Sequence, residues 1–273
     1  MYKHTNVWTK IEKQALWKRC RSFLRVLVPQ LISLALLLVL WYAISYTVTT
    51  DVVPTPTMTL SAFRDALNDG YIWSDLAITL LRMLGAFLLA MLIGVGVGTA
   101  LGLVRWFRNI FGLWVTIAAS IPALLYVVSI YLWLGLNDKA AIISGALVVA
   151  PSLIFNIWQG MKSLDPDLSE MARAFGVPRR TIIRCVLLPQ TLPFLFSTAR
   201  VGLTLTWKII IFVELLGRSS GVGYRIQYWY QLFDMQRVLA SALLFVFVML
   251  IIELIVLRNL EKYLFQWRKE EAQ

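Results

Sequence analysis

The sequence predicts an all-α fold, a polytopic bundle of about six helices that cross a membrane. Hydrophobic residues make up 59% of the 273 residues and charged residues 15%, a balance outside the range of ordinary soluble domains. Six apolar runs are also long enough to cross a bilayer as helices, for which about 18 residues suffice. These runs span residues 26–46, 77–103, 110–134, 140–159, 191–216 and 238–257.

The runs divide the chain into three parts. Residues 1–25 form a basic N-terminal segment, residues 26–257 a transmembrane domain with a long loop at 160–190, and residues 258–273 a tail. The connections between runs are too short for a separate soluble domain. The first run starts too late for a secretory signal and lacks a small-residue cleavage site, so we expect a retained first span.

The basic residues predict the orientation of these spans. Eighteen of the 26 Lys and Arg residues lie in residues 1–25, 104–109, 160–190 and 258–273, which six spans place on one side. Five lie on the other side. Cytoplasmic loops are enriched in Lys and Arg, so both termini are expected in the cytoplasm. The net charge of +11 then reflects topology and contact with the lipid bilayer, with no nucleic acid as a partner.

The connection after the first run predicts a short helix. A Pro-Thr-Pro turn at residues 54–56 precedes Thr59, which is expected to cap this helix. Leu60, Phe63 and Leu67 then share one apolar face. Such a helix is more simply interpreted as resting at the membrane interface than as a ligand site.

Glycine and proline positions predict how the next runs pack. Gly94, Gly98 and Gly102 recur at four-residue spacing in the second run, and glycines so spaced let helix backbones approach closely in lipid. Pro122 and Pro151 lie inside the third and fourth runs. Both are expected to kink their helices.

The long loop predicts a helix, a glycine turn and a second helix. Asp165 can cap the first helix and Pro166 suits its first turn. Gly176 ends that helix, and Pro178 begins a second one that runs to Pro189.

The first of these helices carries an apolar stripe. Leu168, Met171, Ala172 and Phe175 follow at i, i+3, i+4 and i+7, so they lie on one face. An apolar face in a cytoplasmic loop needs a partner to cover it. A membrane-tethered DNA-binding helix-turn-helix is one alternative, but apolar runs directly before and after the loop hold it at the bilayer, away from a major groove.

The same loop resembles a known motif. The stretch Glu170-Met-Ala-Arg-Ala-Phe-Gly176, nine residues, and then Val186-Leu-Leu-Pro189 is similar to the EAA loop of permease subunits of binding-protein-dependent ABC importers. That loop reads Glu-Ala-Ala, three residues, Gly, nine residues, Ile-any-Leu-Pro. Met171 and Val186 depart from it, and both keep an apolar side chain.

Further stretches extend the resemblance to about residues 52–258. Similar stretches occur in one branch of this permease family, which includes permeases for aliphatic sulfonates, taurine and nitrate. These stretches are Ile121-Pro122, Trp133-Leu-Gly135, Leu164-Asp-Pro166, Glu214-Leu-Leu-Gly217 and Gly221-Val-Gly223.

The resemblance implies a type I ABC importer permease in a bacterial inner membrane, without a cofactor or metal. Its implied partners are two copies of an ATPase, a second permease copy in a homodimer, and an extracytoplasmic solute-binding protein. The chain itself has no phosphate-binding loop and is not expected to be an enzyme. The first loop helix would be the coupling helix that docks on the ATPase, with coupling residues Leu168, Glu170, Met171, Ala172, Phe175, Gly176 and Pro189.

A cationic face in the fifth run suggests a small anion as the solute. Arg200, Thr204 and Lys208 recur every four residues and share one helical face beside Trp207. Cations inside an apolar span usually face a cavity or a partner. The alternative is that Arg200 binds a backbone carbonyl or a phospholipid while Lys208 extends to the interface.

An ion-coupled secondary transporter or a channel is the main rival, because six spans fit either class. Ion-coupled transporters usually carry intramembrane carboxylates. The candidates are Glu214 and Glu253, which lie near span ends. There a solvated or interface-reaching carboxylate is the simpler expectation, and the loop motif favours the permease.

Overall fold

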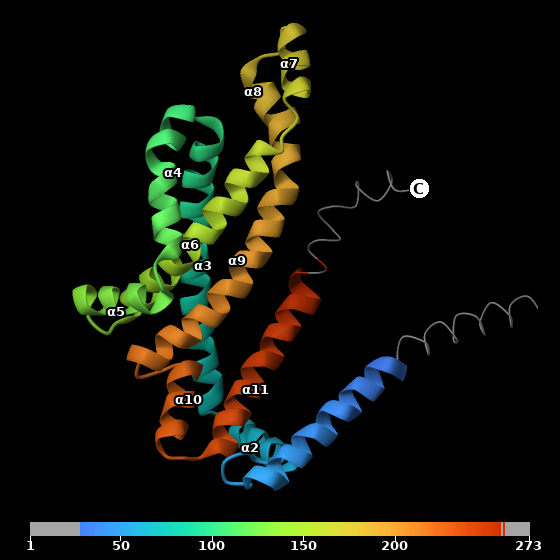
Figure 1. Cartoon of the computed structure of the whole chain (residues 1–273), viewed down its shortest axis with the longest axis vertical. Coiled ribbons are helices and arrows are strands. Elements are labelled where there is room, and N and C mark those ends of the chain that lie inside the picture. Colours follow the sequence, from blue (N-terminus) through green and yellow to red (C-terminus); the bar gives the residue numbers. More distant parts are fainter. Residues whose placement is uncertain (1–27, 258, 260–273) are drawn as a thin grey trace, which may run out of the picture. The chain divides into compact units, whose positions relative to one another are not determined.

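The computed structural model describes residues 28–257 and 259, and every regular element within 28–257 is helical (Figure 1). The chain folds as two compact units, Met1–Ala62 and Phe63–Gln273. The expected basic segment at 1–25 and nearly all of the tail at 258–273 fall outside the described residues.

The helices follow one another along the chain with short connections. The first helix is Val28–Val48. After it, the elements are α2 (Pro56–Asn68), α3 (Tyr71–Leu103), α4 (Arg105–Ser120), α5 (Ala123–Leu134), α6 (Asp138–Lys162), α7 (Pro166–Ala174), α8 (Arg179–Ile182), the π-helical η1 (Ile183–Leu187), α9 (Leu188–Gly217), α10 (Val222–Gln231), α11 (Met235–Ile251) and the π-helical η2 (Ile252–Leu257).

In the first unit, a tight turn joins the first helix to α2. The Ser45 hydroxyl donates to the Val53 carbonyl at 2.6 Å, which closes the turn. The Thr55 hydroxyl accepts from the Met58 amide at 3.3 Å, so Thr55 caps α2. The expected cap at Thr59 is wrong, because Thr59 lies one turn inside the helix and its hydroxyl donates back to the Thr55 carbonyl at 3.1 Å.

Among the described residues, four helices are long and apolar enough to cross a membrane: Val28–Val48, α3, α6 and Met235–Ile255. A fifth crossing results if α4 and α5 count as one broken span, bent by 95°. The kink expected at Pro122 is therefore confirmed, because this break lies at Ile121-Pro122 between the two helices. Pro151 lies inside α6, which continues across it.

The expected fifth run corresponds to α9, which is continuous from Leu188 to Gly217 but is not among those four helices. Its composition accounts for the difference from the expected six spans. Arg200, Lys208 and Glu214 interrupt its apolar sequence, and charged side chains lower the hydropathy of a helix more than any other type.

The core of the second unit lies where α3, α6 and α9 pack together. Ala86 and Ala90 of α3, Leu153 of α6, and Ile210 of α9 belong to one buried cluster. A Cβ atom at Gly94 would lie 2.8 Å from the Leu153 Cβ. The close helix approach expected from the glycines is confirmed, and it joins α3 to α6 within one chain.

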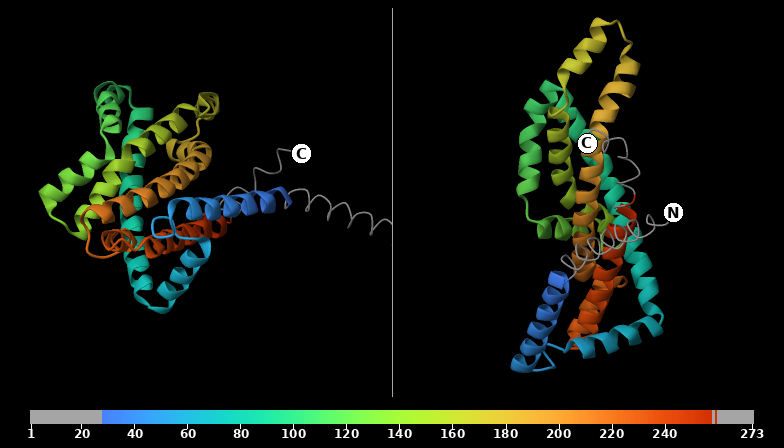
Figure 2. Two further views of the ribbon diagram at one scale, coloured as in Figure 1. Left: turned by 60° about the horizontal axis from the view of Figure 1, so that its bottom comes forward. Right: turned by 90° about the vertical axis from the view of Figure 1, so that its right-hand side faces the viewer.

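The hairpin of α7 and α8 projects beyond the packed ends of α3 and α6 (Figure 1, Figure 2). The Asp165 carboxylate accepts from the Asp167 amide at 2.9 Å, as a helix N-cap does. Gly176 has φ +72°. The Val177 amide donates to the Ala172 carbonyl and the Gly176 amide to the Arg173 carbonyl, which is a Schellman C-cap.

The second loop helix does not stop at Pro189 as expected. It passes from α8 through η1 into α9, which begins at Leu188. The Leu188 amide donates to the Ile183 carbonyl, five residues back. A wide π turn at this point accommodates the proline, which has no amide to donate and whose ring crowds the preceding turn.

Candidate functional site

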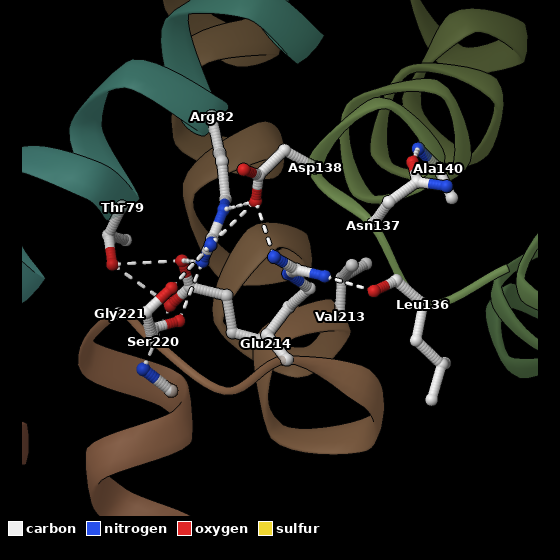
Figure 3. A network of polar contacts seen from close by, with 12 residues as sticks. Thr79, Arg82, Leu136, Asn137, Asp138, Ala140, Val213, Glu214, Ser220 and Gly221 are labelled. Atoms are coloured by element: carbon white, nitrogen blue, oxygen red, sulfur yellow. Dashed lines mark hydrogen bonds and ion pairs between the residues drawn. The ribbon is translucent and has the colours of Figure 1, made fainter.

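Two regions at opposite ends of α9 carry the unusual chemistry of this chain. The first is built around Glu214, which lies in the last turn of α9 and is fully buried. Its carboxylate accepts from the Arg82 guanidinium at 2.6 Å and from the Gly223 amide at 2.9 Å (Figure 3). The Thr79 hydroxyl lies 2.9 Å from the same carboxylate. A buried carboxylate is stable only with such partners, since burial removes its hydration.

Arg82 of α3 joins four segments through its guanidinium. Besides Glu214, it donates to the Asp138 carboxylate at 2.8 Å and to the Ser220 carbonyl at 2.7 Å. Its exposed fraction is 3%. Arg218 also donates to Asp138, at 2.8 Å, and to the Leu136 carbonyl. Ion pairs and hydrogen bonds therefore hold α3, the start of α6, the last turn of α9 and the turn after α9 together.

Asp75 of α3 adds a second pair of contacts to the same turn. Its carboxylate accepts from the Gly221 amide at 2.9 Å and from the Arg225 guanidinium at 2.8 Å. The Thr79 hydroxyl accepts from the Val222 amide at 2.9 Å. We call the whole set the α9–α10 polar network: Asp75, Thr79, Arg82, Asp138, Glu214, Arg218, Ser220, Arg225 and the backbone of residues 221–223.

The glycines of this turn are required by the network. Gly221 has φ +103°, where L-residues are strained. A Cβ atom at Gly221 would collide with the Glu214 carboxylate, and one at Gly223 would collide with the Ile211 carbonyl. The Glu-Leu-Leu-Gly stretch, which begins at Glu214, and the Gly-Val-Gly stretch at 221–223 therefore pack directly against each other.

The expectation that Glu214 is solvated or reaches the interface is wrong. The signal that could have revealed its burial was Arg82, because an arginine inside an apolar helix needs a carboxylate or carbonyl partner. Glu253 is also paired. It lies 2.8 Å from Arg200, and both side chains are partly exposed.

The second region is the coupling-helix candidate α7. Leu168, Met171 and Phe175 are 42%, 54% and 79% exposed, and we call these three residues the α7 stripe. Ala172 is buried. Glu170 is exposed, whereas Pro189 lies at the start of α9, half-buried.

The candidate pathway residues of α9 have different surroundings. Arg200 is paired with Glu253, and the Thr204 hydroxyl donates to the Arg200 carbonyl at 3.1 Å. Trp207 is buried and stacks on the Phe245 ring. Lys208 is exposed on the surface of this chain.

Comparison with known proteins connects these features to a family. A taurine transport system permease protein of Escherichia coli is 26% identical over 245 residues, covering 87% of this chain and 89% of the relative. A putative aliphatic sulfonates transport permease protein of Bacillus subtilis is 28% identical, covering 86% and 85%. A riboflavin transport system permease protein of Chloroflexus aurantiacus is 29% identical, covering 79% and 82%.

The fold has a solved counterpart as well. A chain of the MetNI methionine ABC transporter, in an inward-facing conformation, matches with a TM-score of 0.59 and 23% identity, covering 68% of this chain and 93% of that chain. This likeness shows the type I ABC importer permease fold. Residues 90–262 match the family described as binding-protein-dependent transport system inner membrane component, and they include α7, α9 and Glu214. The chain is a multi-pass membrane protein and belongs to this family of ABC importer permeases.

Proposed function

We propose that this permease forms a translocation pathway for a small anion and is driven by a separate ATPase that docks on α7. The observation that carries the proposal is the α7 stripe, an apolar face exposed on a helix that is capped at both ends. Its caps fix the helix before any partner binds, and a rigid apolar face favours association with another chain.

The proposed assembly follows the family. Two copies of this chain surround the pathway as a homodimer, two ATPase subunits cover the two α7 helices, and an extracytoplasmic binding protein delivers the solute. ATP hydrolysis occurs in the ATPase subunits, and this chain has no catalytic role. Leu168, Glu170, Met171, Ala172, Phe175, Gly176 and Pro189 are the proposed coupling residues.

Co-purification tests the docking surface. We expect Phe175→Ser and Met171→Ser to lower the amount of ATPase retained by the tagged permease, because each removes apolar contact area. Leu132→Ser is the matched control, since Leu132 is 78% exposed but belongs to α5. Equal ATPase retention by all three variants and the wild type would contradict the docking surface.

The proposed orientation places α7 and both termini in the cytoplasm and the α9–α10 polar network at the outer face. Arg180, in α8, then lies inside the cell. A single cysteine at 180, in a Cys20→Ser, Cys185→Ser background, should resist a membrane-impermeant maleimide in intact cells and react after lysis. Labelling in intact cells would reverse the orientation.

The anion is supported by Lys208, an exposed residue within an apolar stretch of α9. Arg200 contributes less, since its charge is paired with Glu253. Thr204 completes the proposed pathway face, and Trp207 packs behind it against Phe245. Relatives named for taurine and sulfonates agree with a small anion, whereas the riboflavin relative shows that similar identity accompanies a different solute.

Lys208→Met should lower the uptake rate for taurine, an alkanesulfonate or nitrate when the binding protein is saturated. The charge lost is the one proposed to attract the anion. Lys139→Met, which removes an exposed lysine outside α9, is the control. Unchanged rate and solute preference in Lys208→Met would refute the anion pathway and leave the ATPase-docking proposal intact.

A further inference from the structure

A side-chain contact connects α7 to α9 at the base of the projecting hairpin. The Gln190 side-chain carbonyl, in the first turn of α9, accepts from the Asp165 backbone amide at 3.0 Å. The backbone N–H of Asp165 can only donate, so the side-chain oxygen of Gln190, and not its nitrogen, must face it. This contact fixes which way the Gln190 side chain is turned. Asp165 is the residue that caps α7.

The side-chain nitrogen of Gln190 is buried next to a cavity. This Nε2 atom has no hydrogen-bond partner. Gln190 lines a cavity of about 420 Å³ together with Ser163, Pro193, Phe194 and Ser197. A buried donor without a partner costs free energy, so the benefit of a glutamine at this position lies in its bond to Asp165.

Gln190 lies in the helix that connects the α7 hairpin to the α9–α10 polar network. Asp165 caps the start of α7, which carries the α7 stripe, whereas Gln190 lies in the first turn and Glu214 in the last turn of α9. Gln190 and Glu214 are 24 positions apart in α9, which corresponds to roughly 36 Å at 1.5 Å per residue. A displacement of α7 reaches α9 through the covalent chain of α8 and η1 and, directly, through this hydrogen bond.

We propose that Gln190 is a positioning residue for energy coupling: its carbonyl fixes the start of α7 to α9, so that movement of α7 on the ATPase is transmitted along α9. The inference rests on the proposed docking of an ATPase on α7. The π-helical η1 interrupts the α-helical hydrogen-bond register between α8 and α9. The Gln190 bond bypasses η1.

Three variants separate the contact from the bulk of the side chain. Gln190→Met keeps the length and removes the acceptor. Gln190→Glu keeps an acceptor for the Asp165 amide, and the positive end of the α7 helix dipole favours its charge. Gln159→Ala is the matched control, a glutamine with an exposed side chain in the last turn of α6.

The readout is independent of the solute. The complex with its ATPase carries one reporter, Tyr230→Cys in α10, whose native side chain is 56% exposed. The background is Cys20→Ser and Cys185→Ser. The rate of maleimide labelling at this cysteine is measured with and without a non-hydrolysable ATP analogue.

We expect the analogue to change the labelling rate in the wild type, in Gln190→Glu and in Gln159→Ala. In Gln190→Met the effect should fall by about fivefold, the factor that corresponds to one lost hydrogen bond. Hydrogen exchange at the start of α7 should accelerate in Gln190→Met alone.

Two results would overturn the inference. In the first, the analogue changes the labelling rate as much in Gln190→Met as in the wild type. In the second, the analogue does not change the labelling rate of α10 in the wild-type complex. ATPase retention, scored first, distinguishes these from failure of the proposed function. If the wild type retains no ATPase, the docking proposal fails and this inference fails with it. If it retains the ATPase and Gln190→Met behaves like the wild type, only the inference fails.

Discussion

The two ends of α9 meet opposite physical requirements. At Glu214, the charged groups of α3, α6, α9 and α10 pair with one another and with backbone amides, and the carboxylate is fully buried. At the other end, the α7 stripe leaves three apolar side chains exposed. One end pairs its charged side chains with one another and with backbone groups of the same chain, whereas the other retains apolar surface that this chain does not cover.

This difference indicates which property each region controls. Substitutions in the α9–α10 polar network should act on folding, because they leave buried charges or carbonyls without partners. Substitutions on the α7 stripe should act on assembly and leave the stability of the isolated permease nearly unchanged, because exposed side chains contribute little to it.

Glu214→Ala has the largest expected effect. It leaves Arg82, 3% exposed, without its closest carboxylate. Removing one partner of a buried pair costs about 3–5 kcal/mol, so we expect a large fall in the folded, detergent-soluble fraction and in its melting temperature. The double variant Glu214→Met, Arg82→Met should recover part of the loss. A Glu214→Ala protein with wild-type thermal stability would contradict the structural role of the network.

Gly223→Ala should be the next most damaging change. Its added methyl group would collide with the Ile211 carbonyl, and backbone cannot move aside as a flexible side chain can. We expect a loss of about 1–3 kcal/mol, as for other overpacked sites. Gly96→Ala is the matched control in α3, where an added Cβ meets nothing within 4 Å. It should be neutral or slightly stabilising, since alanine favours a helix. Equal melting temperatures for the two variants would show that the turn tolerates a side chain.

Gly176→Val tests the other region. The glycine has φ +72°, and an added Cβ meets nothing within 4 Å. The cost is therefore conformational, about 1–2 kcal/mol confined to the C-cap of α7. We expect normal insertion and at most a small fall in melting temperature, with ATP-driven uptake much reduced. Asparagine tolerates this backbone conformation better, so Gly176→Asn should retain more uptake. Normal uptake by Gly176→Val at normal expression would argue against α7 as the coupling helix.

Glu253→Ala should have the smallest effect. Its ion pair with Arg200 joins side chains that are 33% and 43% exposed. Exposed pairs contribute about 0–1 kcal/mol, so the melting temperature should change little in comparison with Glu214→Ala. The two variants are compared in the same detergent. A loss as large as that of Glu214→Ala would show that burial does not distinguish the two carboxylates.

Local sequence patterns predicted the α7 hairpin well. The cap at Asp165 and the turn at Gly176 depend on residues within a few positions of each other, so a short stretch of sequence contains the relevant interactions. The glycine spacing in α3 likewise predicted a close helix approach, although not that α6 is its partner.

The α9–α10 polar network could not be derived in this way. Arg82 and Glu214 are 132 positions apart, and neither residue indicates its partner without the packing of α3 against α9. The 95° bend between α4 and α5 also exceeded what one proline suggests. Thr55 rather than Thr59 caps α2 because Pro56 occupies the first helical position, where its missing amide costs nothing, and this places the preceding Thr55 at the N-cap.

Cross-linking from Phe175 tests the central claim most directly. Phe175 is 79% exposed and belongs to the α7 stripe. In membranes that contain the permease and its ATPase, Phe175→Cys in the Cys20→Ser, Cys185→Ser background should give a covalent permease–ATPase product with a short amine-to-thiol cross-linker. Lys139→Cys, exposed at the start of α6, should give none. A product from position 139 but not from 175, or none from either, would contradict the assignment of α7 as the surface that docks the ATPase.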